Sequence, residues 1–403
     1  MTKRIAVIGA GTAGAISAAF FSHKQHYKEP FEVEWYTDLN IPTQAVGEGS
    51  NLIVPRQLMQ VMGFNYNDLH KIDGTFKSGI AKYNWGKTNN YYFHDFPPPS
   101  VAYHFNAVML QKYLRERLEQ QQRVQFSDKN VSHSDVDADY IIDCTGRPKS
   151  FDDFHNIGVI PVNAVYVTQC FWDTPKFQHT LTIARKYGWV FGIPLTNRCA
   201  IGYLYNNNIN TIEEIKEDVQ NVFEAFGLTP STTTNSFAFS SYFRKQNYTN
   251  RVAYNGNASF FSEPLEATSI GNMMLTNIGM LKIINGEQDV VKTNRDYLFM
   301  NQGSIDMIML HYFAGSIFDT EFWLQAKQKA MIQLTRAAKN PLFANMCRSA
   351  IDNIKNNVRY EDIVGLKQAR GKEYGTWGLL AYVTNIKGLG ITEELDQLLK
   401  QFS

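Results

Sequence analysis

The feature that most constrains the fold is the run RIAVIGAGTAGAISAAFF at residues 4–21, where a short apolar stretch meets a glycine-rich turn and then small residues. Gly9, Gly11 and Gly14 fit the spacing GxGxxG. In a strand–turn–helix unit the first glycine makes the tight turn, the second lets the backbone approach a pyrophosphate, and the third packs helix on strand. The helix N-terminus, with its free N–H groups and dipole, favours an anion. The run therefore predicts a Rossmann-like nucleotide-binding domain.

Two further runs extend this prediction. Residues 31–38, FEVEWYTD, read as the second strand, and its end offers either Thr37 or Asp38 to a ribose. Residues 139–146, DYIIDCTG, read as another buried strand, with an ending found in many FAD proteins. The chain contains one GxGxxG pattern, which favours bound FAD without a separate NAD(P)H domain.

Composition narrows the class of protein. The 403 residues are enough for two or three subdomains, and the hydrophobic fraction of 44% is that of a globular protein. Thirty-nine basic against 38 acidic residues leave a net charge of +1, which argues against a general nucleic-acid binder. The cysteines and histidines show no metal-ligand spacing, so we expect no metal and reduced thiols.

The N-terminal segment could be mistaken for a signal peptide, because Lys3 and Arg4 precede an apolar run. Its glycines stand where a nucleotide fold needs them, and no unbroken apolar run reaches about 18 residues. We therefore expect this segment to belong to the mature fold, with no membrane-spanning helix and a cytoplasmic location.

The remaining patterns predict the architecture. Short β-branched and aromatic runs predict an antiparallel sheet beside the nucleotide domain, and the C-terminal part has helical spacing. We expect an α/β protein with an FAD-binding Rossmann-like domain, an antiparallel β-sheet subdomain and a helical C-terminal part. We expect the first part of the FAD-binding domain at residues 1–150 and a β-sheet subdomain for substrate at 151–250. The chain then returns to the FAD domain at 251–290 and ends in a helical subdomain at 291–403.

Two charged residues stand out. Glu266 follows Pro264 in RVAYNGNASFFSEPLEATSIG, residues 251–271, where small residues and a turn could hold an anion beside a carboxylate suited to acid–base work. The plainer interpretation is a solvated acid in the first turn of a helix. Lys77 lies in the strand-like run 73–86, on a face with small neighbours. Its plainer interpretation is an exposed strand lysine.

Four stretches, taken in order, resemble the flavin-dependent halogenases of the tryptophan-halogenase type: GAGTAG at 9–14, TFKSGI at 75–80, WVFGIP at 189–194 and EPLEATSI at 263–270. Supporting matches are VGEGS at 46–50, YHFNA at 103–107 and DCTG at 143–146. Two positions depart from the family pattern, since Phe191 replaces the second tryptophan of WxWxIP and Ala267 replaces a serine.

The resemblance implies a reaction in which reduced FAD, O2 and a halide (chloride, bromide or iodide) make hypohalous acid, which is delivered to Lys77 to halogenate an electron-rich aromatic substrate. It implies catalytic roles for Lys77 and Glu266, halide binding at Thr268 and Ser269, and a passage lined by Trp189, Phe191, Ile193 and Pro194. The implied FAD contacts are Gly9, Gly11, Thr12, Ala13, Gly14, Thr37, Asp38, Val46, Gly47, Glu48, Gly49 and Ile270.

The expected partners are a separate flavin reductase and a small aromatic substrate, with no nucleic acid or membrane, and an oligomer of identical chains is left open. The main alternative is an FAD-dependent aromatic monooxygenase, in which Lys77 and the Trp189 cluster would be structural. A flavin-binding protein without activity is a third interpretation, suggested by Phe191 and Ala267.

Overall fold

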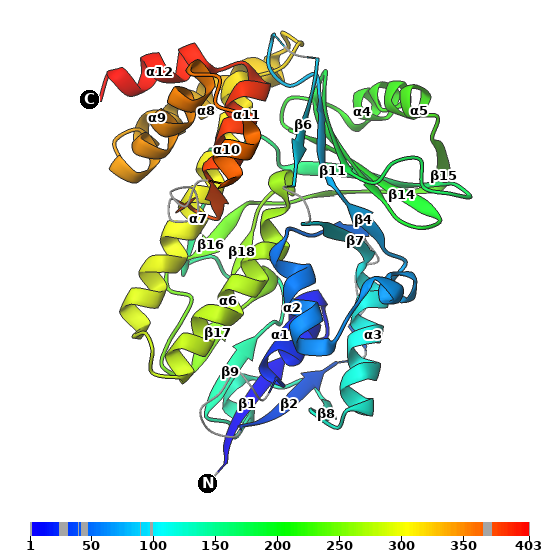
Figure 1. Cartoon of the computed structure of the whole chain (residues 1–403). Helices are drawn as coiled ribbons and strands as arrows, with labels where there is room; N and C mark the ends of the chain where they lie inside the picture. Colours follow the sequence, from blue (N-terminus) through cyan, green and yellow to red (C-terminus); the bar gives the residue numbers. More distant parts are fainter. Residues whose placement is uncertain are drawn as a thin grey trace.

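The computed structural model describes residues 2–23, 31–38, 40–41, 47–88, 90–96, 100–365 and 373–402. These residues form an α/β fold with a parallel sheet near the N-terminus, antiparallel sheets beside it and a helical C-terminal part (Figure 1). The predicted fold class is confirmed.

The parallel sheet carries the glycine turn. Its strand order is β17-β9-β1-β2-β8, and every neighbouring pair is parallel. The strands are β1 (Lys3–Ile8), β2 (Phe31–Thr37), β8 (Gln125–Asp128), β9 (Tyr140–Asp143) and β17 (Val252–Tyr254). The central strand β1 ends in four buried apolar residues, as expected for a strand covered on both faces. Helix α1 (Thr12–Phe21) packs on β1, β2 and β9, and α6 (Thr268–Ile284) packs on β17. Helices α2 (Ile53–Met62), α3 (Ala107–Gln120) and α6 each contact α1.

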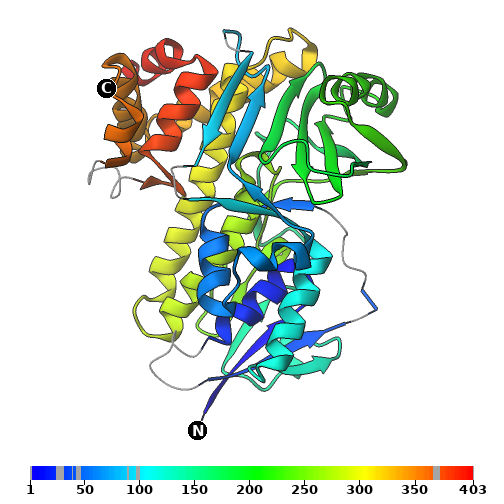
Figure 2. The same cartoon turned by 45° about the vertical axis from the view of Figure 1, so that its right-hand side comes forward.

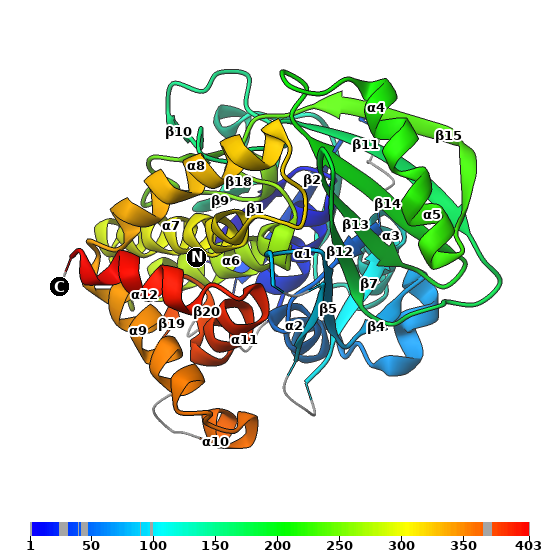
Figure 3. The ribbon, with the colours of Figure 1, turned by 90° about the horizontal axis from the view of Figure 1, so that it is seen from above.

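The largest sheet has seven strands in the order β15-β11-β14-β13-β12-β5-β6. They are β5 (Gly79–Tyr83), β6 (Tyr91–Asp95), β11 (Ala164–Phe171), β12 (Thr180–Arg185), β13 (Gly188–Pro194), β14 (Arg198–Tyr205) and β15 (Thr229–Ala238). Because β5 and β6 come from residues 79–95, the range 151–250 contains only part of this sheet. Seen from above, α4 (Ile212–Asp218) and α5 (Gln220–Phe226) lie along one side of it (Figure 3).

A small sheet, β3-β7-β4, lies between the parallel sheet and the seven-stranded sheet (Figures 1 and 2). Its strands are β3 (Gly47–Gly49), β4 (Thr75–Lys77) and β7 (Ala102–Asn106). Ser78 separates β4 from β5, with its N–H donating to Gln178 O at 3.0 Å and its carbonyl accepting from Phe96 N at 3.1 Å. The predicted single run 73–86 is therefore two strands of different sheets, and Lys77 lies at their junction. A further small sheet contains β10 (Phe154–Asn156), β16 (Tyr242–Arg244) and β18 (Phe260–Phe261).

The C-terminal part is built around α7 (Val290–Ala314), which at 25 residues is about 37 Å long. It is followed by α8 (Glu321–Ala337), α9 (Pro341–Lys355), α10 (Tyr360–Gly365), the hairpin β19 (Glu373–Tyr374) and β20 (Trp377–Gly378), α11 (Leu379–Leu389) and α12 (Thr392–Lys400). Residues 303–314 of α7 are buried throughout. Across the described ranges, no helix combines the length and apolarity needed to cross a membrane. The four cysteines are buried free thiols, and the described residues contain no cluster of three metal-ligating side chains.

Asp306 is a fully buried carboxyl on α7 that ties the helical part together. Its oxygens accept hydrogen bonds from Gln302 Nε2 at 3.1 Å, Gln333 Nε2 at 2.7 Å and the Tyr374 hydroxyl at 2.8 Å. No lysine, arginine or histidine in the described residues forms an ion pair with it. Burial raises the pKa of Asp306 from its ordinary 3.8 to about 6.

We predict that Asp306→Asn will remove a pH-dependent loss of stability. The folded state holds the Asp306 proton to a higher pH than the unfolded chain, so the wild-type free energy of unfolding should fall as pH rises from about 4 to about 6. At about 1.4 kcal/mol per pKa unit the loss is about 3 kcal/mol. Asparagine keeps a carbonyl acceptor without the ionisation. Denaturant titrations of both proteins at pH 4, 6 and 8 measure the difference, and parallel pH curves would contradict the prediction.

Candidate functional site

The glycine turn between β1 and α1 contains two glycines that the protein itself requires. Gly9 has φ +123°, and a Cβ there would lie 2.2 Å from the carbonyl oxygen of Cys144. A Cβ on Gly14 would lie 1.9 Å from the carbonyl oxygen of Gly9. That carbonyl accepts the Trp35 indole N–H at 2.8 Å, which fixes the turn on β2. Side chains at either position would displace backbone.

Gly11 is different. Apart from its chain neighbours, no described atom comes within 4 Å of a Cβ built on it, and its φ of −71° and ψ of −177° are open to any residue. Gly11 is the N-cap of α1, and no side-chain hydrogen bond from the described residues caps that helix. Space and free N–H groups at a helix N-terminus suit a pyrophosphate. The turn therefore fits the phosphates of FAD.

Among the other predicted cofactor residues, Thr12 and Glu48 meet at the start of α1. The Thr12 hydroxyl donates to Glu48 Oε1 at 3.2 Å and accepts from Gln111 Nε2 at 3.1 Å, so β3 lies beside the turn. Burial raises the pKa of Glu48 to about 7. Gly47 and Gly49 pair with β7. Ala13 is buried in α1, Ile270 is buried in the first turn of α6, and Val46 lies outside the described residues.

The two residues considered for a ribose contact differ in their surroundings. Thr37 is buried, and its hydroxyl donates to Asp128 Oδ1 at 2.5 Å and accepts from Arg115 Nη1 at 3.2 Å. Asp38 is partly exposed and accepts from Asn130 Nδ2 at 3.1 Å. The Thr37 hydroxyl is thus occupied within the protein, whereas Asp38 reaches the surface at the end of β2.

Lys77 is buried, with 1% of its surface exposed, so the interpretation as an exposed strand lysine is wrong. Its ammonium donates to the carbonyl oxygen of Ser50 at 3.0 Å and lies 5.7 Å from the centre of the Phe96 ring. Burial lowers the pKa of Lys77 to about 8, against the opposing charge of Glu266. A neutral amine is therefore accessible near neutral pH, which is unusual for lysine.

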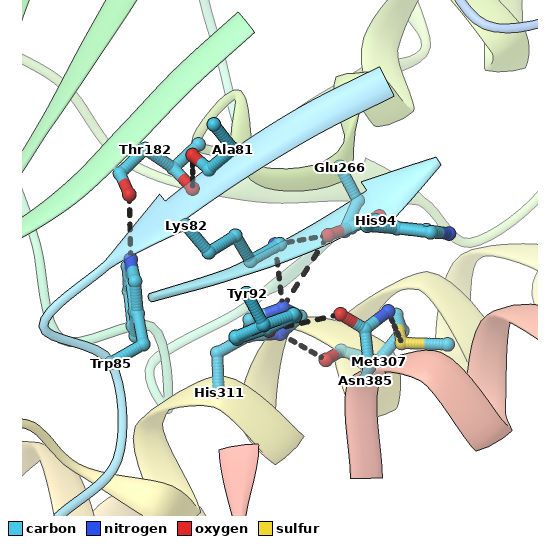
Figure 4. A network of polar contacts seen from close by, with 10 residues as sticks. All are labelled: Ala81, Lys82, Trp85, Tyr92, His94, Thr182, Glu266, Met307, His311 and Asn385. Atoms are coloured by element: carbon cyan, nitrogen blue, oxygen red, sulfur yellow. Dashed lines mark hydrogen bonds and ion pairs between the residues drawn. The ribbon is translucent and has the colours of Figure 1, made fainter. Parts of the chain in front are cut away.

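Glu266 is also buried, which excludes the alternative of a solvated acid. It has φ 65° and ψ 15°, and Ala267 has φ 54° and ψ 41°, so two consecutive non-glycine residues adopt the left-handed region just before α6. Such strain is concentrated at functional sites and must be held by surrounding contacts. Here the contacts are ionic, because the Glu266 carboxylate is paired with the Lys82 ammonium (Figure 4).

Three residues that the sequence patterns did not indicate surround Glu266: Lys82 on β5, His94 on β6 and His311 on α7 (Figure 4). His94 Nδ1 lies 3.0 Å from Glu266 Oε2 without hydrogen-bond alignment, and His311 Nε2 lies 3.4 Å from Oε1. Although burial opposes ionisation, the charge of Lys82 holds the pKa of Glu266 well below its ordinary value. Glu266 is therefore an ionised carboxylate at neutral pH.

The contacts of His311 also define its tautomer. His311 Nδ1 lies 3.0 Å from the Met307 carbonyl oxygen, so Nδ1 carries the proton. Nε2 is then free to accept from Lys82 Nζ at 2.7 Å. Burial and the charge of Lys82 lower the pKa of His311 and keep the ring neutral. The one signal available in the sequence was a charged or polar residue inside an apolar run, as in GIAKY and IMLHYF.

Thr268 and Ser269 begin α6, directly after the strained pair. Thr268 is buried, and its hydroxyl has no hydrogen-bond partner among the described residues. No described side chain caps this helix. A buried, unpaired donor at a helix N-terminus suits a small anion.

The four residues of the predicted passage all belong to β13. Trp189, Phe191 and Ile193 alternate along the strand and so share one face, with the first two rings 6.4 Å apart. The Phe191 ring covers Gly202 of β14, where an added Cβ would lie 2.2 Å from Phe191 Cζ. Pro194 lies on the other face, and its carbonyl accepts from the Thr75 hydroxyl at 2.7 Å. The aromatic row is therefore set firmly in the sheet.

The sequence is similar to that of known halogenases over most of its length. The sequence model of the tryptophan halogenase family matches residues 4–133 and 98–364. Tryptophan 7-halogenase RebH of Lentzea aerocolonigenes is 24% identical over 261 residues, which cover 57% of this chain and 49% of RebH. The chain spans about half the length of the curated relatives it matches.

Solved structures share the whole fold. The tryptophan halogenase of Shewanella frigidimarina superposes with a TM-score of 0.75 at 17% identity, covering 100% of this chain and 93% of that one. Xcc4156, a flavin-dependent halogenase of Xanthomonas campestris, superposes with a TM-score of 0.76 at 18% identity, covering 100% of this chain and 94% of that one.

Proposed function

This chain belongs to the tryptophan halogenase family, and from that premise we propose that it is a flavin-dependent halogenase. It uses reduced FAD, O2 and a halide to halogenate an electron-rich aromatic substrate. The observation that carries the proposal is Lys77, a fully buried lysine whose hydrogen bond goes to a backbone carbonyl rather than to a carboxylate. A fold gains no stability from such a residue, because burying an ammonium without an ion pair is costly.

The FAD would be held at the start of α1. The open position at Gly11 and the uncapped helix N-terminus receive the pyrophosphate, and the loop of Gly47, Glu48 and Gly49 lies beside it. We propose Asp38 for the ribose, since the Thr37 hydroxyl is already used within the protein. When bound, reduced FAD supplies the electrons that let O2 and halide yield hypohalous acid.

The halide would be held by the start of α6. The unpaired Thr268 hydroxyl and the N–H groups at Thr268 and Ser269 provide donors in a buried setting. The row of Trp189, Phe191 and Ile193 would form an apolar wall beside which hypohalous acid passes, with water excluded.

Lys77 would receive the oxidant. A pKa of about 8 leaves the amine able either to donate a hydrogen bond to hypohalous acid or, once neutral, to form a haloamine. Glu266, ionised and fixed by Lys82, would orient the oxidant or take the ring proton. A carboxylate of low pKa is a weak base, but the protonated ring produced by electrophilic attack is a strong acid, so a weak base suffices.

The alternative function is an FAD-dependent aromatic monooxygenase. It would require the substrate ring to reach the flavin itself, and it leaves the buried Lys77 without a role. For the halogenase, a separate flavin reductase is the proposed partner, because the sequence carries a single GxGxxG pattern for a nucleotide.

One assay separates these functions. The purified protein is mixed with chemically reduced FAD, O2, bromide and a panel of phenols, heteroaromatics and tryptophan, and products are identified by mass spectrometry. We expect brominated product from several small aromatics. Hydroxylated product would favour the monooxygenase. If neither brominated nor hydroxylated product forms, the protein binds flavin without either activity. Omission of bromide is the control, because halogenated product must then disappear.

A further inference from the structure

Glu263 is a second buried carboxyl near the candidate site, three residues before Glu266 and with the opposite surroundings. It has no exposed surface. Its Oε2 atom accepts from the Trp189 indole N–H at 3.0 Å and from the Tyr312 hydroxyl at 2.7 Å, while Oε1 has no hydrogen-bond partner in the described part of the chain. No basic side chain in that part forms an ion pair with it.

Burial and these contacts act in opposite directions on the pKa of Glu263, because the two hydrogen bonds donated to Oε2 favour the ionised form. A buried carboxyl without a cation is costly to ionise, and burial accordingly raises the pKa of Glu263 to about 7. Because Oε2 accepts twice, the proton of the neutral form would be on Oε1. The two neighbouring carboxyls therefore differ, since Lys82 keeps Glu266 ionised, whereas Glu263 has no cation beside it among the described residues and loses its proton only near pH 7. Environments that separate two carboxyls in this way are typical of sites where the two have different tasks.

Glu263 also joins three parts of the molecule. Trp189 lies on β13, Tyr312 lies on α7, and Glu263 belongs to the stretch that leads into Glu266. The Trp189 N–H also lies 3.0 Å from the Tyr312 oxygen, which closes a triangle of polar groups. Trp85 packs between this triangle and the charged cluster, 6.2 Å from Trp189 and 5.6 Å from His311. A shift of Glu263 would therefore move the Trp189 ring, and with it the apolar wall on β13, relative to Glu266.

We propose that Glu263 is a positioning residue, which fixes the Trp189 ring against the Glu266 loop so that hypohalous acid reaches Lys77 instead of escaping. This inference rests on the proposed halogenase function. It assigns Glu263 no contact with the substrate or the oxidant. The proposed role of Glu263 is to raise the fraction of hypohalous acid that halogenates the substrate.

The test measures that fraction in full-length protein. Wild type, Glu263→Ala and Glu263→Gln are supplied with reduced FAD, O2, bromide and a phenol, with a soluble 1,3-diketone present to trap escaped hypobromous acid. Brominated phenol, brominated diketone and flavin oxidation are measured together. Asp306→Ala is the matched control, because it removes another fully buried carboxyl that accepts from a tyrosine, but the hydrogen bonds of Asp306 go to Gln302, Gln333 and Tyr374 and not to Trp189.

We expect Glu263→Ala to lower phenol bromination by about a hundredfold, the scale of a 1 Å misplacement, with flavin oxidation unchanged and the trapped share raised. Glu263→Gln keeps a neutral acceptor for Trp189 and Tyr312, so its ratio of brominated phenol to brominated diketone should equal that of the wild type. Asp306→Ala should leave this ratio unchanged. An unchanged trapped share in Glu263→Ala, or an equal rise in Asp306→Ala, would overturn the inference.

A second variant keeps the test decisive if Glu263→Ala does not fold. Tyr312→Phe removes one hydrogen bond to Glu263 and keeps the ring, so it should raise the trapped share to a smaller extent; no rise would count against the inference. Wild type that brominates neither phenol nor diketone would instead overturn the proposed halogenase function. The positioning role alone has failed if the wild-type protein brominates phenol and every variant partitions bromine between phenol and diketone as the wild type does.

Discussion

Replacement of Lys77 by alanine is expected to reduce halogenated product by more than about a hundredfold, the lower range for loss of one proton-transfer group. FAD binding and oxidation of reduced flavin should stay near wild type, because these steps take place at the flavin and not at the lysine. The comparison requires stopped-flow flavin oxidation and product quantification on the same preparations. The separation of the two steps is what distinguishes a halogenase from a monooxygenase.

The structure makes this prediction sharper, because Lys77 is buried without an ion pair among the described residues. Alanine removes a costly buried ammonium, so the variant should fold. Lys77→Arg should not restore product, since a guanidinium stays protonated and is too bulky for this site. Ser78→Ala is the neighbouring control, because its exposed hydroxyl only donates to the Gln178 carbonyl at 2.9 Å.

Near wild-type product from Lys77→Ala would make Lys77 a structural residue and would refute the mechanism proposed for it. Glu266→Gln makes a useful comparison. It breaks the ion pair with Lys82, so it should cost folding stability as well as turnover. Loss of product without loss of stability is expected for Lys77 alone.

Substitution of Gly11 by valine is expected to abolish FAD binding while the protein stays folded. Valine fits the backbone conformation at Gly11 and meets no described atom within 4 Å, but its side chain would occupy the space proposed for the pyrophosphate. Quenching of flavin fluorescence on titration measures the affinity, and circular dichroism checks the fold. Unchanged affinity would show that the phosphates lie elsewhere.

Two further glycines serve as controls. Gly158→Val also adds a side chain in open space, with no described atom within 4 Å, and should leave both fold and FAD affinity intact. Gly14→Val should fail to fold, because its side chain would collide with the Gly9 backbone. The three variants together separate a lost ligand contact from a lost fold.

Much of the fold follows from local patterns. The run 4–21 predicted β1, the turn and α1, because a buried parallel strand and a helix of small residues are each recognisable from a short window. The limits of this approach appear at residues 102–121, where the apolar spacing of Ala107, Leu110, Leu114 and Leu118 by itself suggests one amphipathic helix. Residues 102–106 instead form β7, since the edges of Gly47–Gly49 and Thr75–Lys77 both pair with them. Sheet pairing with distant strands overrides local helical spacing.

By itself the sequence determined the class of fold, the glycine turn and the identity of Lys77 and Glu266 as the charged residues of interest, because these depend on residue types at close spacing. Only the tertiary structure decided their chemical states. Lys82 and Glu266 are 184 residues apart, and Lys82 and His311 are 229 apart, yet they meet in one buried cluster. Ionisation of a buried group depends on which charges surround it and on how much water remains, and both are properties of the packed molecule. For this reason Lys82 holds the pKa of Glu266 well below its ordinary value, while burial raises the pKa of Glu263, three residues away, to about 7.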